Sequence, residues 1–331
     1  PRWGGRSPEL EDPEVLRWIG RLLARLHAVG RQQPFAERLT WASAAPAGWS
    51  RSRLADRYHR CKGSEWDPWE WALMACRRCR LVAVRDRLTA RGLRRHGVSA
   101  LAPGNPMMDE LPSEPLPSAL QGCRRLLLLP GSRLPESLSN LSGLLGALPR
   151  LPGPADGPAA WTLLLATGSR PSASELAGPL LAAGFQPQES ARQARSPAAP
   201  EQIWRRGGIA LWLGKGTLGA WAGWAELALA TAGTATEQVV GLGLPALSLP
   251  GSGPQFKAGF ARRQSRLLGG AVQPCRSPEE LGRRLEALLN DGPERQRLAR
   301  IGRRRMGGPG GSVRLAALIE RHLLGPRPTD G

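Results

Sequence analysis

The chain has 331 residues, which is enough for two domains with hydrophobic cores, and a formal net charge of +19. Such a basic protein can meet nucleic acid, an anionic membrane surface or phosphorylated substrates, but no aromatic–basic RNA-binding signature or zinc-finger spacing appears. Five cysteines argue against a disulfide framework, and no apolar run approaches the ~20 residues of a membrane-spanning helix. We therefore expect a globular, cytoplasmic protein.

The N-terminal residues carry few structural signals. Residues 13–29 have helical spacing of apolar side chains, and residues 56–79 hold a tryptophan-rich patch that favours core packing, with a membrane interface as the alternative. Cys76 and Cys79 have CxxC spacing, and a zinc site would need Cys61 and His59 as further ligands. We expect ordinary thiols there.

Composition divides the chain into an N-terminal and a C-terminal part. Two βα-type units are expected between residues 80 and 110, with strands at 81–84 and 98–101 and a helix at 88–95. Residues 111–121 are proline-rich and read as a linker of limited flexibility. The predicted domains are 1–110 and 122–311, with a final helix at 312–325, capped by Ser312, that packs back on the N-terminal domain.

Strands and helices alternate along the second domain, which predicts a parallel sheet covered by helices on both faces. The strands are expected at 125–129, 161–166, 209–213, 227–230 and 246–249, and the helices at 138–148, 172–183, 219–224, 237–242, 278–290, 293–305 and 313–324.

The stretch 227–255 reads as strand, tight turn, helix, strand. A turn at a helix start directs backbone N–H groups outward at the positive end of the helix, which suits a phosphate or diphosphate. Thr234 and Thr236 would cap the helix or bond a ligand, and Glu237 would accept from a sugar or ribose hydroxyl. The alternative is an ordinary turn with a hydroxyl cap, but further glycine turns at 130–133 and 250–255 favour a ligand crevice.

Three motifs together resemble the bacterial lipid-A-disaccharide synthase family. They are Pro130-Gly131-Ser132-Arg133 with Glu136, Gly233 to Glu237, and Gly104-Asn105-Pro106 with Asp109. The longer strings VRDRLTARGLRRHGV, GNPMMD, AGTATEQVVGLGLPALSLPGSGPQF and RRQSRLLG are similar to its cyanobacterial lipid-A-disaccharide synthase-related branch. The match covers residues 55–325 and implies an α/β fold of GT-B type, with two Rossmann-like domains and parallel sheets.

The resemblance also implies an activity and a donor site. The activity is transfer of an N-acetylglucosamine-like sugar from a UDP-sugar to a lipid-linked acceptor, at the cytoplasmic face of the inner membrane, with no cofactor. No Asp-x-Asp metal motif stands out. The resemblance places the UDP-sugar at Gly131, Ser132, Arg133, Glu136, Gly233, Thr234, Ala235, Thr236, Glu237 and Gln255.

Residues 1–50 lack the strand, glycine loop and helix with which the family's N-terminal domain begins. The resemblance therefore implies an incomplete, N-terminally truncated domain, and no catalytic residue is assigned. Asp86 and Asp109 are the acids left in the remnant, and we expect Asp86 to be a helix cap or a surface ion pair.

Two other functions remain open on the sequence. A UDP-sugar 2-epimerase shares the architecture but would need a histidine near the sugar, and none of the four histidines lies near the turns. A basic, non-catalytic binding protein on a decayed scaffold would bind DNA or anionic lipid in a salt-dependent way. No specific nucleic acid partner is expected.

Overall fold

The computed structural model describes residues 76–77, 79, 81–109, 111–148, 161–188, 196–231, 233–251 and 258–324. The helix expected at 13–29 and most of the tryptophan-rich patch lie outside these ranges. Backbone contacts divide the chain into two compact units, one of residues 1–82 and 93–99 and one of residues 83–92 and 100–331. The domain boundaries predicted from composition stay predictions.

The first described elements form a two-stranded sheet with one helix. Strand β1 (Val82–Ala83) pairs with β2 (Ala100–Leu101), and α4 (Arg87–Arg95) connects them. Asp86 caps α4, accepting hydrogen bonds from the Thr89 N–H and hydroxyl, each at 2.7 Å. This confirms the predicted cap. The second βα unit expected here does not form, because β2 leads into the short 3-10 turn η2 (Pro106–Met108), with a proline at its first position.

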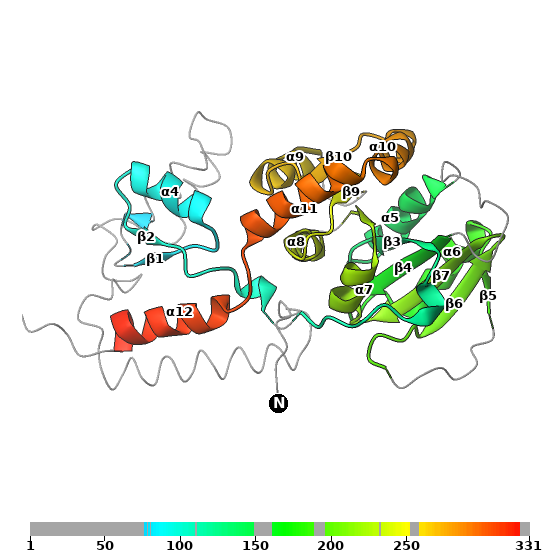
Figure 1. The fold of residues 1–331 in the computed structure, drawn as a ribbon, viewed down its shortest axis with the longest axis horizontal. Coiled ribbons are helices and arrows are strands. Elements are labelled where there is room, and N and C mark those ends of the chain that lie inside the picture. The colour runs from blue at the N-terminus through cyan, green and yellow to red at the C-terminus, as the bar shows by residue number, and fades with distance from the viewer. Residues whose placement is uncertain are drawn as a thin grey trace, which may run out of the picture. The chain divides into compact units, whose positions relative to one another are not determined.

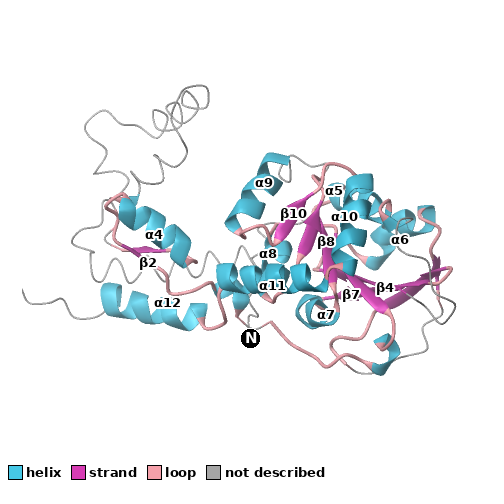
Figure 2. Ribbon diagram, turned by 45° about the horizontal axis from the view of Figure 1, so that its top comes forward, coloured by secondary structure: helices cyan, strands magenta, loops and turns pink. Residues whose placement is uncertain are grey.

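An eight-stranded, mostly parallel sheet carries the second half of the chain, and its strand order is β10-β9-β8-β3-β4-β7-β6-β5 (Figures 1 and 2). The predicted α/β class is confirmed. The strands are β3 (Arg124–Leu129), β4 (Trp161–Thr167), β5 (Gln186–Pro187), β6 (Gln202–Arg206), β7 (Ile209–Lys215), β8 (Leu227–Ala230), β9 (Ala246–Ser248) and β10 (Val272–Pro274).

All helices of this part of the chain except α9 lie close to their predicted positions. They are α5 (Glu136–Leu145), α6 (Ala173–Ala182), α7 (Leu218–Trp224), α8 (Thr234–Gly241), α9 (Ala258–Leu267), α10 (Pro278–Asn290), α11 (Gly292–Met306) and α12 (Gly311–Ile319), which ends in the π-helical turn η5 (Glu320–Leu324). Ser172 and Glu175 form the capping box that starts α6.

Strands β5 and β6, helix α9 and strand β10 were not expected from the sequence. Both β5 and β6 are antiparallel to their neighbours and form one edge of the sheet. The segment of β6 is only partly buried and charged at its end, so it lacks the continuous apolar run that marks the central strands.

The sheet buries both of its faces. Leu126 and Leu128 of β3 belong to one hydrophobic cluster with α5, α6 and α10, whereas Leu127 and Leu129 belong to another with α7 and α8. Alternate side chains of a strand point to opposite faces, so a run of four leucines fills both cores. Helices α5 and α8 therefore lie on opposite faces of the sheet.

The segment expected to be a linker packs on α7. The Trp224 Nε1–H donates to the Glu114 carbonyl oxygen at 2.8 Å, and Leu120 is 1% exposed. A Cβ atom on Gly219 would lie 2.7 Å from the Pro112 carbonyl oxygen, which shows how closely the two segments approach.

The cap of the last helix differs from the prediction. Ser312 lies inside α12, whose N-cap is Gly310 in the left-handed conformation, so its hydroxyl is not the cap. Asp109 takes that role and accepts the N–H groups of Gly310, Gly311 and Ser312.

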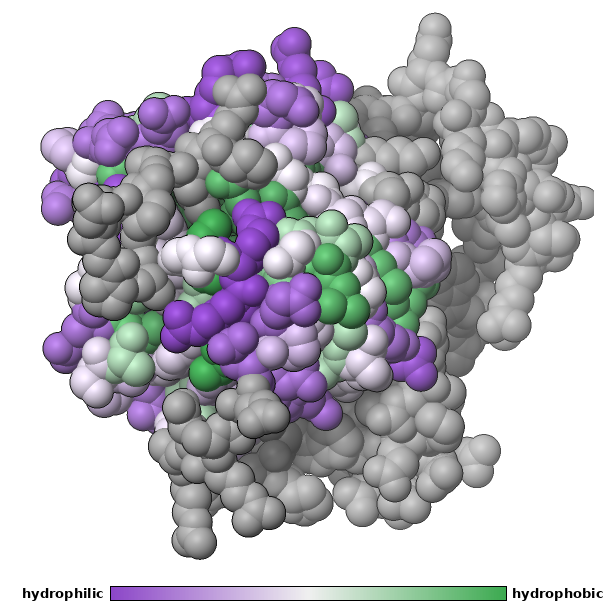
Figure 3. Space-filling model, turned by 90° about the vertical axis from the view of Figure 1, so that its right-hand side faces the viewer, coloured by the Kyte–Doolittle hydropathy of each residue, from purple (hydrophilic) through white to green (hydrophobic). Residues whose placement is uncertain are grey.

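The described surface gives no sign of a membrane-crossing element. None of the described helices combines the length and the apolar character that crossing a bilayer requires. The large apolar side chains exposed in the described part of the chain are scattered, and on the face shown in Figure 3 hydrophilic residues run between the hydrophobic ones.

Candidate functional site

The candidate site lies where β3 and β8 end. These two strands are parallel neighbours, with Leu129 opposite Ala230. Strands β4 and β7, which follow β3 in the sequence, lie on one side of β3. Strand β8 lies on the other side and is followed there by β9 and β10. Ligands of open α/β sheets bind beside the carboxyl ends of the strands at such a reversal of order. The structure thus brings the two predicted turns, 130–136 and 233–237, to one edge.

Hydrogen bonds through Thr231 join the two turns. Its N–H donates to the Leu129 carbonyl oxygen at 2.9 Å, and its hydroxyl donates to the Pro130 carbonyl oxygen at 3.0 Å. Asn140 Nδ2 reaches the same Pro130 oxygen at 3.0 Å. Thr231 is buried, so this connection belongs to the framework beneath the two turns. The sequence motifs did not single it out.

The first turn exposes a cation. Gly131 has a φ of +92°, a conformation that favours glycine, and the following Ser132 and Arg133 are exposed. Arg133 makes no hydrogen bond or ion pair with its side chain to any residue in the described ranges. Its guanidinium is therefore available to an anion.

Glu136 sits differently from its predicted role as a donor contact. It opens α5, where a carboxylate already complements the positive helix end, and its Oε2 atom is buried with no partner among the described residues. An anion would meet like charge at this helix start. The N-terminus of α5 is thus a poor diphosphate site.

The second turn has a bare helix start. Gly233 is the N-cap of α8 and no side chain of the described residues caps the helix, so the expected cap by Thr234 or Thr236 is wrong, whereas their alternative role as ligand contacts stays a prediction. The first helical bond runs from the Glu237 N–H to the Gly233 carbonyl oxygen at 3.2 Å, and the N–H groups of Thr234 and Ala235 come before it. Thr234 is exposed, but Thr236 is fully buried, which places its hydroxyl away from a surface ligand.

Glu237 is already paired. Its Oε2 atom accepts a hydrogen bond from Arg85 Nη1, and only 12% of its side chain is exposed. Arg85 was not predicted as a site residue, since 152 positions separate the two in sequence. The ion pair with Arg85 compensates the negative charge of Glu237 in the first turn of α8. Glu136 of α5 has no such pairing with a described residue. Of the two helix starts, α8 therefore suits an anion better.

Gln264 holds the turn from below. This residue of α9 is 3% exposed, and its Nε2 donates to the Gly233 carbonyl oxygen at 2.9 Å. A sequence signal did exist, because Gln264 falls between the buried Ala261 and Leu268 at helical spacing, a polar residue on an apolar stripe. Gln255, the remaining predicted donor contact, lies in 252–257, outside the described residues.

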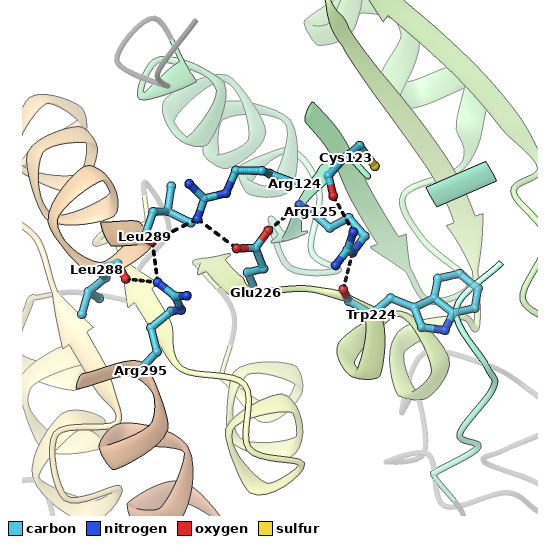
Figure 4. Close-up of polar contacts among 8 residues, drawn as sticks. All are labelled: Cys123, Arg124, Arg125, Trp224, Glu226, Leu288, Leu289 and Arg295. Atoms are coloured by element: carbon cyan, nitrogen blue, oxygen red, sulfur yellow. Dashed lines mark hydrogen bonds and ion pairs between the residues drawn. The ribbon is translucent and has the colours of Figure 1, made fainter. Parts of the chain in front are cut away.

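Arginines at the other end of β3 serve the fold instead. Arg124 contacts Glu226 Oε2 at 2.9 Å and the Leu289 carbonyl oxygen at 3.0 Å, and Arg125 Nε contacts the Trp224 carbonyl oxygen at 2.7 Å (Figure 4). Both side chains are thus engaged at the amino-terminal edge of the sheet. Arg133, at the carboxyl end of the same strand, is not.

Cysteines and metal ligands add nothing to this site. Cys76, Cys79, Cys123 and Cys275 are not joined in disulfides, and burial raises the pKa of Cys275 to about 12. In the described ranges, no three His, Cys, Asp or Glu residues gather closely enough to hold a metal ion. Cys61 and His59, the further ligands that a zinc site would need, lie outside those ranges.

A cavity of about 390 Å³ opens at the far end of α8, lined by Leu242, Met108, Arg303 and Pro309 among others. It is mainly apolar and lies away from both turns. The candidate site is therefore defined by the turns and their hydrogen bonds.

No protein-family model matches the chain, and no curated protein matches it in sequence. Solved structures do resemble it. One, described as a UDP-N-acetylglucosamine 2-epimerase from Listeria monocytogenes, has 14% identity and a TM-score of 0.49 over 77% of this chain and 62% of its own. The calicheamicin glycosyltransferase CalG4 has 15% identity and a TM-score of 0.46 over 98% and 62%.

The UDP complex of MnaA from S. aureus has 14% identity and a TM-score of 0.47 over 76% of this chain and 62% of its own. This chain thus spans about three fifths of the length of each of these proteins. The similarity is distant and concerns the fold, which glycosyltransferases and UDP-N-acetylglucosamine 2-epimerases share.

Proposed function

We propose that the two turns at the ends of β3 and β8 bind the diphosphate of a UDP-sugar, and that the protein transfers the sugar to a lipid-linked acceptor. One observation carries the proposal: the turns after these strands are joined through Thr231 at the reversal of strand order. The uncapped start of α8 supplies main-chain N–H groups, and Arg133 supplies an exposed cation.

These groups suit the chemistry of transfer. The bond between the anomeric carbon and the β-phosphate oxygen breaks, the acceptor hydroxyl oxygen forms the new bond and releases its proton to solvent, and UDP leaves with the added negative charge. A helix N-terminus and an arginine stabilise such a charge where it develops. The donor sugar is proposed to be N-acetylglucosamine-like.

The acceptor and the location belong to the same proposal. A formal net charge of +19 favours contact with an anionic membrane surface, where a lipid-linked acceptor would be presented. The protein would act there as a peripheral, cytoplasmic enzyme that needs no cofactor beyond its donor substrate.

The test is a titration of the full chain with UDP, UDP-N-acetylglucosamine and uridine, followed by melting temperature and tryptophan fluorescence. UDP at about 100 times its Kd is expected to stabilise the folded protein by about 2.7 kcal/mol. Arg133→Ala should weaken UDP binding about tenfold without changing the affinity for uridine. Arg205→Ala is the matched control, because it removes an exposed arginine from β6, three strands away from β3.

The outcomes separate the three functions. Release of UDP that requires a lipid acceptor supports the transferase. Conversion of the UDP-sugar to its 2-epimer without an acceptor would replace it with an epimerase. A chain that ignores UDP but binds DNA in a strongly salt-dependent way would be a basic binding protein.

A further inference from the structure

Gln264 is a buried polar residue whose bonding is half complete. Its Nε2 donates to the Gly233 carbonyl oxygen at 2.9 Å, and since only the NH₂ group can donate to a carbonyl, this contact sets the orientation of the amide. The Oε1 atom is buried and has no hydrogen-bond partner among the described residues. A satisfied donor and an unsatisfied acceptor thus share one side chain.

Stability alone does not explain a glutamine at this position. A buried acceptor without a partner costs free energy, whereas a leucine or methionine would fill a similar volume on the stripe between Ala261 and Leu268 without that cost. The Gly233 carbonyl oxygen also accepts the Glu237 N–H at 3.2 Å, so removing the glutamine would not leave this oxygen without a bond. What the glutamine adds is a restraint on Gly233.

That restraint acts on the start of α8. Gly233 has φ −86° and ψ −81°, outside the helical region, and as a glycine it has no side chain with which to cap the helix. Helix α9 instead contacts Gly233 itself: Gln264 Nε2 donates to the Gly233 carbonyl oxygen, and the Phe260 ring lies 3.7 Å from where a Cβ of Gly233 would lie. The direction of the following N–H groups therefore depends on α9.

We propose that Gln264 is a positioning residue of the diphosphate site, which holds Gly233 so that the N–H groups at the start of α8 are aligned before the ligand arrives. The inference rests on the proposed function. It predicts that a change at Gln264 alters the affinity for the phosphate groups alone, because the side chain lies under the turn that would bind them. Such preorganisation lowers the free-energy cost of binding.

The experiment compares Gln264→Leu and Gln264→Met with the wild-type full chain. Both variants are expected to melt at the wild-type temperature or above it, because the unsatisfied acceptor is gone. Both should bind UDP about tenfold more weakly and bind uridine as the wild type does. Gln264→Glu should lose more affinity for UDP, since its carboxylate would repel both the Gly233 carbonyl oxygen and the diphosphate.

The matched control is Gln238→Leu. Gln238 also donates its Nε2 to a main-chain carbonyl, that of Met107 at 3.1 Å, but it lies beyond the first turn of α8. This variant should keep the wild-type affinity for UDP. If Gln238→Leu weakened UDP binding as much as Gln264→Leu does, the effect would come from α8 as a whole and the proposal would be wrong.

The remaining outcomes are distinct. Wild-type protein that does not bind UDP overturns the proposed function, and the role of Gln264 with it. Wild-type protein that binds UDP while Gln264→Leu binds it equally well overturns only the role of Gln264. A lower melting temperature with equal losses for UDP and uridine would make Gln264 a residue of the fold.

Discussion

At the scale of single residues, the environment of each arginine decides its role. Arg124 and Arg133 flank the same strand, yet Arg124 is fixed by Glu226, by the Leu289 carbonyl and by the ring of Trp161, whose centroid is 5.2 Å away. Arg133 is exposed and has no such contacts with the described part of the chain. An arginine that is already paired within the fold is not available to a ligand. The number of arginines in the sequence therefore overstates the number that can bind an anion.

Glu226 is the residue on which this network depends. It accepts from Arg124 Nη2 at 2.9 Å and from the Arg125 N–H at 3.2 Å, so Glu226→Ala removes the acceptor of two donors. We expect a loss of about 1–2 kcal/mol in the free energy of unfolding, measured by urea denaturation. Glu294→Ala, which breaks a surface pair with Arg297 on α11, should leave the midpoint nearly unchanged. Equal losses in the two variants would contradict this assignment.

At the scale of elements, close helix packing fixes α8, the helix that opens the site. Helix α11 lies against it through Gly302, where a Cβ atom would clash with the Val240 carbonyl oxygen. On the other side of the same contact, a Cβ on Gly241 would lie 2.6 Å from the Met108 Cε and 2.8 Å from the Met306 Cβ. The close approach of α8 to its neighbours is thus possible because glycines, which have no side chain, lie at the contacts.

Two glycine-to-alanine changes should therefore have opposite signs. Gly302→Ala is expected to destabilise the protein by about 1–3 kcal/mol, because the backbones must separate. Gly143→Ala in α5, where a Cβ atom meets nothing within 4 Å, should stabilise it by about 0.5–1 kcal/mol, because alanine has the higher helix propensity. Thermal unfolding of both variants measures this difference, and a neutral Gly302→Ala would refute the close approach.

At the scale of the whole molecule, Asp109 joins two segments about 200 positions apart. Burial alone would raise the pKa of its carboxyl, but hydrogen bonds from the Ser312 side chain and from the N–H groups of residues 310–312 outweigh this and lower the pKa below its ordinary value of 3.8. A group with a depressed folded-state pKa stabilises the fold above its unfolded-state pKa, and this contribution is lost as the pH falls through the folded-state value.

Helix α12 should therefore depend on Asp109 and on pH. Asp109→Ala is expected to cost α12 about 0.5–2 kcal/mol of local stability, measured as faster amide hydrogen exchange in residues 311–319. In the wild type, the same protection should decline only below about pH 3.8. Asp291→Ala removes the local cap of α11, whose carboxylate accepts the Glu294 N–H at 2.9 Å, and should leave α12 protected. Unchanged exchange in Asp109→Ala would show that packing alone holds the helix.

Local sequence signals were sufficient to predict the central strands and helices and the two turns. Apolar runs marked β3, β4, β7, β8 and β9, and the motifs marked the turns at Gly131 and Gly233. These features depend on residues within a few positions of one another, because strand burial, helix caps and positive φ angles are local properties. The half-exposed strands β5 and β6 lack that signal and were missed.

Only the tertiary structure decided which distant groups meet. It placed β8 beside β3, paired Arg85 with Glu237, set Gln264 under Gly233 and gave α12 its cap from Asp109. None of these contacts follows from local propensity, because each joins segments that only the packing of both sheet faces brings together. The sequence by itself predicted a strand, a tight turn and a helix start of the kind that suits an anion, whereas the folded chain determined which charges and which buried amide surround that turn.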